Sequence, residues 1–236
     1  MSIRKLVRTF KRKILHKPDE DEFYKNFFIG NKKWNRASPN YDENLRWSVI
    51  ENFLYFIEGY RTALSNNSKS NILDVGCGRG WLSNILSGHG NVIGIEPVKA
   101  VVEYGRRLFP GLDLRIGTTQ NLIDEGHESY FDIIVCSEVI EHIADDKKAA
   151  FLNDLKRLLK ENGFLILTTP RKDAEAEWKK YGDPEQPIEN WIFEKVLAKL
   201  LSAAGFQTHL LKRLSMPPLK RAPEIEIYQL WLAQKR

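Results

Sequence analysis

From residue 71 onward, short apolar runs alternate with segments of helical periodicity, and this pattern constrains the fold more than any other feature of the chain. Parallel strands that are covered on both faces give nearly continuous apolar runs, separated by the helices that cross over them. Seven such runs are present: 72–75, 92–96, 112–116, 131–137, 164–169, 206–214 and 225–233. The pattern predicts an α/β fold built on a doubly wound, Rossmann-like sheet of seven strands.

Helical periodicity marks six segments: 44–64, 81–86, 98–108, 120–124, 145–160 and 192–204. Glycine and asparagine often follow the last residue of a helix, so Asn162 and Gly163 are expected to end the fifth segment and Gly205 the sixth. The loop 215–223 between the last two strands holds three prolines. A direct connection of this kind favours an antiparallel pair, so the final strand is expected to run in reverse.

Two segments of different composition precede the sheet. Residues 1–18 form a basic amphipathic prefix, and residues 19–70 are expected to be a helical extension or lid, with aromatic residues around Trp34 and Tyr41. A chain of 236 residues with 42% hydrophobic residues is sufficient for one core. Residues 71–236 are therefore expected to form a single domain.

The net charge of +5 is concentrated at the front of the chain. Seven Lys or Arg residues and no acids lie within residues 1–18, so the remainder carries a net charge of −2 (5 minus 7). An enzyme of nucleic acids needs a basic stripe beside its active site, and this balance argues against a nucleic-acid partner. The apolar residues at helical spacing within 1–17 suit a helix on anionic lipid or on a phosphate-bearing partner, and they also suit a solvated tail.

Neither a run of about 20 apolar residues nor the apolar core of a secretory signal is present in the sequence. We therefore expect a cytoplasmic protein, with peripheral contact at the inner membrane face through the prefix as a further hypothesis. Cys77 and Cys136 are too few for a disulfide framework and lack the spacing of a zinc site, so both are expected to be packed residues. The sequence does not specify an oligomeric state.

The first apolar run ends in three alternating glycines, Gly76, Gly78 and Gly80, just before a predicted helix. Glycines at such a turn let the backbone bend tightly and let a ligand approach the main chain. The dinucleotide fingerprint instead leaves two residues between its second and third glycines, where a pyrophosphate binds. Asp74 would repel a pyrophosphate, so the loop favours a cationic ligand. Glu96 ends the next strand, where a carboxylate can accept hydrogen bonds from a ribose.

The segment 72–206, which carries these motifs, resembles the class I S-adenosylmethionine-dependent methyltransferases, and within them the ubiquinone-biosynthesis O-methyltransferases. The resemblance implies a seven-strand sheet with an antiparallel final hairpin, S-adenosylmethionine as the cofactor, and transfer of its methyl group to an acceptor. It further implies which residues bind the cofactor: Asp74, Gly76, Gly78 and Gly80 at its methionine end, Glu96 at its ribose, and Thr118, Thr119 and Gln120 at its adenine. Many relatives have an aspartate where Thr118 stands. Three neighbouring residues complete the predicted cofactor set: Cys77, Pro97 and Ser137.

Glu138, Glu141 and His142 follow the fourth apolar run and are the candidate catalytic residues. If the segment turns helically, their spacing places all three on one face. They could then supply a general base, or bind a divalent ion such as Mg²⁺, or only cap and orient the loop. The E-x-x-E-H pattern resembles the metal-binding motif of the ubiquinone-type enzymes and of small-RNA 2′-O-methyltransferases. The RNA enzymes need a further histidine downstream, and the corresponding stretch here, 183–187, has none.

An oxygen acceptor needs a base or a metal, because a phenol with a pKa near 10 is ionised only about one part in a thousand at pH 7. The leading hypothesis is O-methylation of a small molecule or a saccharide, with residues 19–41 and a polar insertion at 171–190 as candidate lids. Their tryptophans Trp34 and Trp178, together with Trp191, either face the acceptor or pack on the sheet. The alternatives are an RNA 2′-O-methyltransferase, a non-catalytic cofactor-binding protein and an NAD-dependent oxidoreductase.

Overall fold

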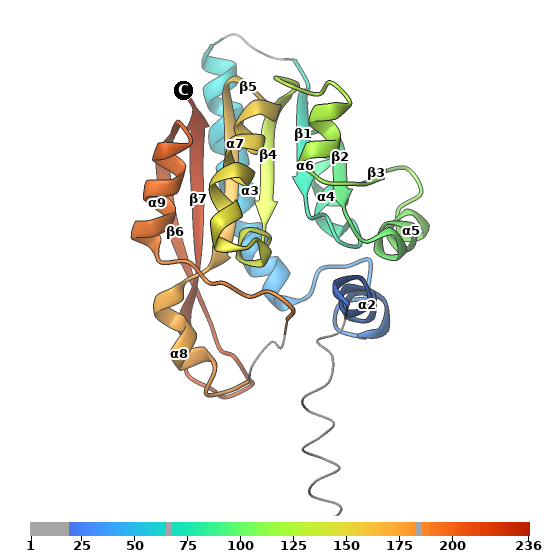
Figure 1. Ribbon diagram of the computed structural model, residues 1–236, viewed down its shortest axis with the longest axis vertical. Helices are drawn as coiled ribbons and strands as arrows, with labels where there is room; N and C mark the ends of the chain where they lie inside the picture. The colour runs from blue at the N-terminus through green and yellow to red at the C-terminus, as the bar shows by residue number, and fades with distance from the viewer. Residues whose placement is uncertain (1–18, 65–67, 183–185) are drawn as a thin grey trace, which may run out of the picture.

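One sheet of seven strands runs through the residues that the computed structural model describes, which are 19–64, 68–182 and 186–236 (Figure 1). The strand order is β3-β2-β1-β4-β5-β7-β6. The strands are β1 Ser70–Val75, β2 Gly90–Glu96, β3 Asp113–Ile116, β4 Phe131–Ser137, β5 Leu159–Pro170, β6 Phe206–Met216 and β7 Ile225–Lys235. The pairs among β1 to β5 are parallel, and β7 runs antiparallel to both β5 and β6. The predicted fold class and the reversed final strand are confirmed.

Helices cover both faces of the sheet, because each parallel strand is apolar on both sides. On one face, α3 (Tyr41–Ala63) and α4 (Trp81–Leu86) share a core with β1 and β4. On the other face lie α6 (Thr119–Asp124), α7 (Lys148–Leu158) and α9 (Glu194–Ala203). The remaining crossover helix, α5 (Lys99–Leu108), packs against β2 and β3.

The predicted end of the helix at Asn162 and Gly163 is wrong. The helix stops at Leu158, and both residues lie inside β5, which begins at Leu159. Leu159 pairs with Phe131 of β4, and a register shift follows in the ladder. Asn162 has φ +62°, as expected at an irregular point in a strand, so the turn residues mark a bulge and not a helix end. Gly205, with φ +85°, does follow the end of α9 as predicted.

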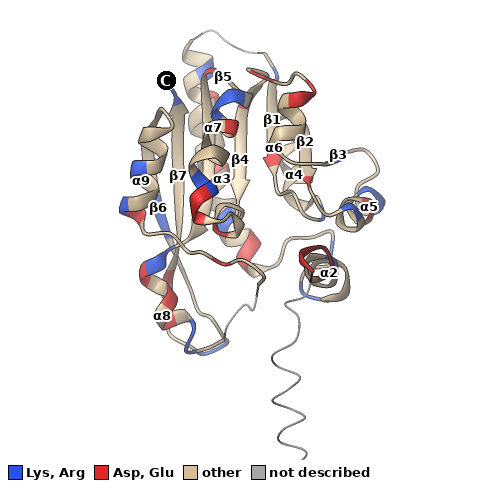
Figure 2. Ribbon diagram, viewed as in Figure 1, with Lys and Arg blue, Asp and Glu red and all other residues tan. Residues whose placement is uncertain are grey.

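The segment before α3 forms a short helix, α2 (Glu20–Lys25), and a π-helical turn, η1 (Asn26–Gly30). It lies beyond the edge of the sheet toward which β1 and β4 point, and Figure 2 shows the acidic first turn of α2. Helix α3 begins with a capping box, in which Asn40 and Glu43 each accept a backbone N–H of the other.

Within the described residues, no helix has the length and the apolar character needed to cross a membrane. The predicted amphipathic prefix, 1–18, lies outside the described residues. The predicted boundaries between prefix, extension and main domain stay predictions.

Candidate active site

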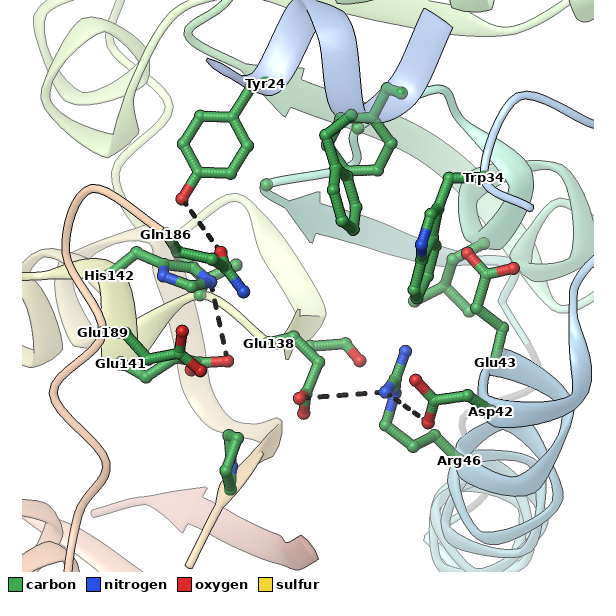
Figure 3. Close-up of a pocket in the computed structure, with 18 of the residues that line it drawn as sticks. Tyr24, Trp34, Asp42, Glu43, Arg46, Glu138, Glu141, His142, Gln186 and Glu189 are labelled. Carbon is green, nitrogen blue, oxygen red and sulfur yellow. Dashed lines mark hydrogen bonds and ion pairs between the residues drawn. The ribbon is translucent and has the colours of Figure 1, made fainter. Parts of the chain in front are cut away.

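A cavity of about 450 Å³ lies at the carboxyl ends of β1, β2 and β4 (Figure 3). The order of the strands reverses here, because β1 is followed along the chain by its neighbour on one side and later by its neighbour on the other. Open α/β sheets bind their ligands at such a point. The loop after β1 provides one wall of the cavity, and the loop after β4 provides another.

The glycine loop after β1 is held in a left-handed conformation. Gly76, Gly78 and Gly80 have φ values of +67°, +52° and +85°, which residues with a Cβ rarely adopt. The amide of Gly78 donates to Oε2 of Glu96 at 3.3 Å, and Oε1 of Glu96 accepts from the amide of Val98 at 3.0 Å. Glu96 therefore connects the glycine loop to the end of β2.

Two buried carboxyl groups stand beside this loop. Asp74 Oδ2 accepts a hydrogen bond from Ser83 Oγ at 2.6 Å, and Asp74 and Glu96 are 1% and 6% exposed. Burial raises the pKa of Asp74 to about 7 and that of Glu96 to about 7. A cationic ligand would compensate for the missing solvation of both carboxylates, and this favours a sulfonium cofactor over a diphosphate.

Seven of the predicted cofactor residues line the cavity: Asp74, Gly76, Cys77, Gly78, Glu96, Pro97 and Ser137. Four others do not: Gly80, Thr118, Thr119 and Gln120. The last three lie at the start of α6 and have protein partners: Thr118 is the N-cap and forms a capping box with Asn121, Thr119 donates to Asp154 of α7, and Gln120 donates to Asp124. The predicted contact with adenine stays a prediction.

All three candidate catalytic residues line the cavity, but the expected continuous helical turn does not form. Glu138 has φ +59°, and only Ile140–His142 forms a turn, the 3₁₀ helix η2. The left-handed backbone of a non-glycine residue is costly, and such conformations cluster at functional sites. It aims Glu138 away from η2, toward Thr168 Oγ1, which donates to Glu138 Oε1 at 2.8 Å.

The carboxyl groups of Glu138 and Glu141 have different partners, and their side chains are 20% and 2% exposed. Thr169 Oγ1 donates to Glu141 Oε2 at 2.9 Å, whereas Glu138 Oε2 lies 3.7 Å from the guanidinium of Arg46. Burial raises the pKa of Glu138 to about 8 and that of Glu141 to about 7. Both carboxyl groups therefore keep a proton to higher pH than an exposed glutamate does.

His142 is positioned as a neutral imidazole. Its Nδ1 lies 2.8 Å from the carbonyl oxygen of Ile188, and burial lowers the pKa of the ring. A carbonyl oxygen only accepts, so Nδ1 must carry the hydrogen. In the neutral ring, Nε2 then has a free lone pair. The Nε2 atom lies 3.8 Å from Oε1 of Glu141 (Figure 3).

The three residues do not fit a magnesium site. Among the described residues, no group of three or more His, Cys, Asp or Glu side chains is arranged to hold a metal ion. Glu138 faces Arg46, and His142 is oriented by a backbone carbonyl. The expected joint coordination of Mg²⁺ by Glu138, Glu141 and His142 has no support in this arrangement.

Sequence reasoning missed a buried polar cluster on α3. Arg46 is 5% exposed, donates to Asp42 Oδ1 at 2.9 Å and lies between Asp42 and Glu138 (Figure 3). Its guanidinium also lies 5.0 Å from the ring centre of Tyr228 on β7. The i,i+4 spacing of Asp42 and Arg46 was the available signal, but only the packing of α3 against β7 shows that the pair is buried.

Aromatic residues from distant segments close the cavity. Residues 19–40, which we call the N-terminal cover, contribute Tyr24, Phe27, Phe28 and Trp34, and the insertion after β5 contributes Trp178. Tyr24 Oη donates to Gln186 Oε1 at 3.4 Å, so the cover and the insertion meet across the site (Figure 3). Trp191 lines the cavity as well, whereas Tyr41 does not and is 62% exposed.

Comparison with known proteins agrees with this architecture. A family model for methyltransferase domains matches residues 48–211. The ubiquinone biosynthesis O-methyltransferase of Rickettsia typhi is 33% identical over 124 residues, which cover 52% of this chain and 50% of that protein. The enzyme of the same name from Azorhizobium caulinodans is 29% identical over 166 residues and covers 63% of each. The chain thus spans about half to two thirds of the length of these curated relatives.

Solved structures share the fold at low sequence identity. A Pyrococcus horikoshii protein superposes with a TM-score of 0.63 at 15% identity and covers 91% of this chain and 99% of that one. The 1,6-didemethyltoxoflavin-N1-methyltransferase of Burkholderia thailandensis, solved with bound S-adenosylhomocysteine, gives a TM-score of 0.60 at 17% identity, covering 92% and 86%.

The fold and the glycine-loop site define a Rossmann-like methyltransferase domain. The chain belongs to the class I S-adenosylmethionine-dependent methyltransferase family, as the match over residues 48–211 and the ubiquinone-type relatives establish.

Proposed function

We propose that this protein transfers the methyl group of S-adenosylmethionine to an oxygen atom of a small-molecule or saccharide acceptor, and that His142 is the general base. The observation that carries the proposal is a neutral, mostly enclosed imidazole, 20% exposed, in the same cavity as the glycine loop. The relatives named ubiquinone biosynthesis O-methyltransferase support an oxygen acceptor.

The residues present fit the cofactor. Gly76 and Gly78 place main chain at the cavity wall, Asp74 and Glu96 offer carboxylates to its cationic and hydroxyl groups, and Cys77 and Pro97 line the same cavity. When bound there, the cofactor supplies an electrophilic methyl group. The adenine contact of Thr118 to Gln120 is a separate proposal, since these residues lie outside the cavity wall.

The protein's own part in the reaction is to hold the acceptor, exclude water and accept a proton. Nε2 of His142 has the free lone pair for that proton, and the hydrogen bond from Nδ1 to Ile188 fixes the ring. Aromatic walls from Trp34 and Trp178 suit a planar ring or the apolar face of a sugar. Enclosure of the acceptor in this cavity favours in-line approach, from which much of the rate enhancement would come.

The pH dependence of turnover distinguishes His142 from the two glutamates. With cofactor saturating, kcat/KM for the acceptor should rise with pH and level off above a pKa below the ordinary 6.5, because burial lowers the pKa of His142. A limb between about pH 7 and pH 8 would assign the base to the Glu138 and Glu141 carboxyl groups instead. His142→Ala should lower turnover by about 10²–10⁴-fold and leave cofactor affinity nearly unchanged.

The acceptor class is tested by offering labelled S-adenosylmethionine with separate pools of glycans, phenols and RNA. Labelling of the glycan or phenol pool, with release of label only under conditions that cleave methyl ethers, would support the proposal. Methylation of RNA alone would replace it with the RNA hypothesis. Cofactor binding without transfer to any pool would favour a non-catalytic cofactor-binding protein.

We also propose that residues 1–17 contact an anionic membrane surface, on the basis of their sequence alone. Co-sedimentation with vesicles containing phosphatidylserine, compared with neutral phosphatidylcholine vesicles, tests this. The full chain should sediment with the anionic vesicles at low salt and be released at high salt, and a chain that begins at residue 19 should not sediment. Equal recovery of both chains would contradict the proposal.

A further inference from the structure

The geometry points to Arg79 and Glu43 as a positioning pair that fastens the N-terminal cover to the glycine loop. Cofactor binding to that loop would then fix the position of the cover, which forms the wall of the cavity that faces the acceptor. This inference rests on the proposed function only in that the glycine loop binds the cofactor. Arg79 stands between Gly78 and Gly80, and Glu43 lies in the first turn of α3.

Arg79 forms a two-point ion pair with Glu43. Its Nη1 and Nη2 lie 2.7 and 2.8 Å from the two carboxylate oxygens, and the side chains of Arg79 and Glu43 are 0% and 2% exposed. Planar pairing of this kind fixes both groups in orientation as well as in distance. Because the pair is completely buried, removing one partner leaves the other without solvent or counter-charge.

The remaining donors of Arg79 hold the backbone of the cover itself. Nε donates to the carbonyl oxygen of Arg36 at 2.5 Å, and Nη2 lies 3.4 Å from that of Ser38. The Arg79 side chain in the glycine loop therefore holds the cover at two points, Arg36 and Ser38, just before α3 begins. Tyr104 of α5 adds a third point, through a hydrogen bond to the carbonyl oxygen of Asn35 at 2.5 Å.

The fastened segment carries the acceptor-facing aromatics. Trp34 lines the cavity, and its ring lies 4.8 Å from that of Phe27 on η1. The next residue, Phe28, lies directly over the loop, since a Cβ built on Gly78 would be only 2.9 Å from its ring. A change in the conformation of the loop at Gly78 or Arg79 must therefore be transmitted to the cover.

Two-way coupling follows from this arrangement. A ligand that favours one conformation of the glycine loop also favours the position of the cover that Arg79 holds, and the reciprocal effect has the same size. Arg79 does not line the cavity and acts through the loop. Glu43 lies at the cavity wall, but both of its carboxylate oxygens are already bonded to Arg79, and one of them also to the amide of Asn40. Arg79 and Glu43 are thus positioning residues for the acceptor site, and cofactor binding should precede productive binding of the acceptor.

The test is amide hydrogen exchange over residues 31–40, with and without saturating S-adenosylhomocysteine. In the natural protein, the ligand should slow exchange in this segment by about fivefold or more. In Glu43→Gln, which retains the shape of the side chain and an acceptor for the cap, the slowing should fall below about twofold even at saturation. Arg79→Met should behave like Glu43→Gln, and Arg79→Lys should recover part of the effect because it keeps the charge.

Arg61→Met is the matched control. Arg61 lies on α3, the same helix as Glu43, and forms an ion pair with the largely buried Asp132 at 2.6 Å. This pair lies far along the helix from Glu43, beside the first residues of β1, where Asp132 accepts from the amide of Asn71. This variant should lose stability and keep the ligand-dependent protection of residues 31–40. If Arg79→Met does not fold, Glu43→Gln and Arg79→Lys decide the question.

Three results would overturn the inference: protection of residues 31–40 that is equal in the natural protein and in Glu43→Gln, absence of protection in the natural protein despite bound ligand, or loss of protection in Arg61→Met as well. If the natural protein does not bind S-adenosylhomocysteine at all, the proposed function falls together with the inference. If it binds without protecting the segment, only the inference falls.

Discussion

Substitution of Gly78 is the sharpest test of the cofactor loop. Gly78 has φ +52°, and a left-handed conformation costs an L-residue roughly 1–2 kcal/mol. A Cβ at this position would also stand 2.9 Å from Cζ of Phe28, so the ring must move. Because Gly78 and Phe28 both line the cavity, the added carbon or the displaced ring should take up space that the ligand needs. Gly78→Ala should therefore lower both the stability and the cofactor affinity, and Gly78→Val should abolish binding.

Gly126→Ala separates the two effects. Gly126 is also left-handed, with φ +85°, but a Cβ at this position would have no atom within 4 Å, and the residue does not line the cavity. Its substitution should lower the Tm by about 2–4 °C for each kcal/mol of backbone cost. Titration calorimetry with S-adenosylhomocysteine should give an unchanged Kd for Gly126→Ala and a Kd at least about tenfold weaker for Gly78→Ala, which corresponds to about 1.4 kcal/mol.

A double variant identifies where the clash lies. If displacement of the Phe28 ring were the whole cause of the weaker binding, combining Gly78→Ala with Phe28→Ala would restore cofactor affinity. We expect the double variant to restore stability more than affinity, because the ligand still meets the Cβ at position 78. Binding of the cofactor to Gly78→Val as tightly as to the natural protein would refute the assignment of this loop.

Two further predictions concern charge at the site. Burial holds the pKa values of Asp74 and Glu96 near 7 in the free protein. A cationic cofactor should therefore bind more tightly as pH rises from 6 to 8, by up to about tenfold per pH unit for each proton released. The affinity should level off above pH 8. Calorimetry in buffers of different ionisation enthalpy counts those protons, and an affinity that is constant over this range would contradict the prediction. Treatment with a chelator should leave turnover unchanged, since Glu138 faces Arg46 and not a shared metal position; loss of activity that Mg²⁺ restores would show this to be wrong.

The sequence determined the parts of the protein that depend on neighbours along the chain. Apolar runs locate the strands, because a strand buried on both faces must be apolar at successive residues. The alternating glycines and Asp74 mark the loop after β1, because a left-handed turn with close ligand approach has a local residue requirement. Glu96 follows from the length of one strand-helix-strand unit, so its place beside the loop was also predictable.

Only the tertiary structure decided what surrounds the transferred group. Asn162 lies inside β5 and not at a helix end, because β5 pairs with β4 from Leu159 onward. Glu138 does not share a helical face with Glu141 and His142, because its own backbone is left-handed. Arg46 contacts two residues that are far away in sequence, Glu138 and Tyr228, and these contacts exist only because α3 packs across the sheet. Burial and pairing of charges depend on which elements pack together in space, and a pattern of spacings along one chain does not contain that information.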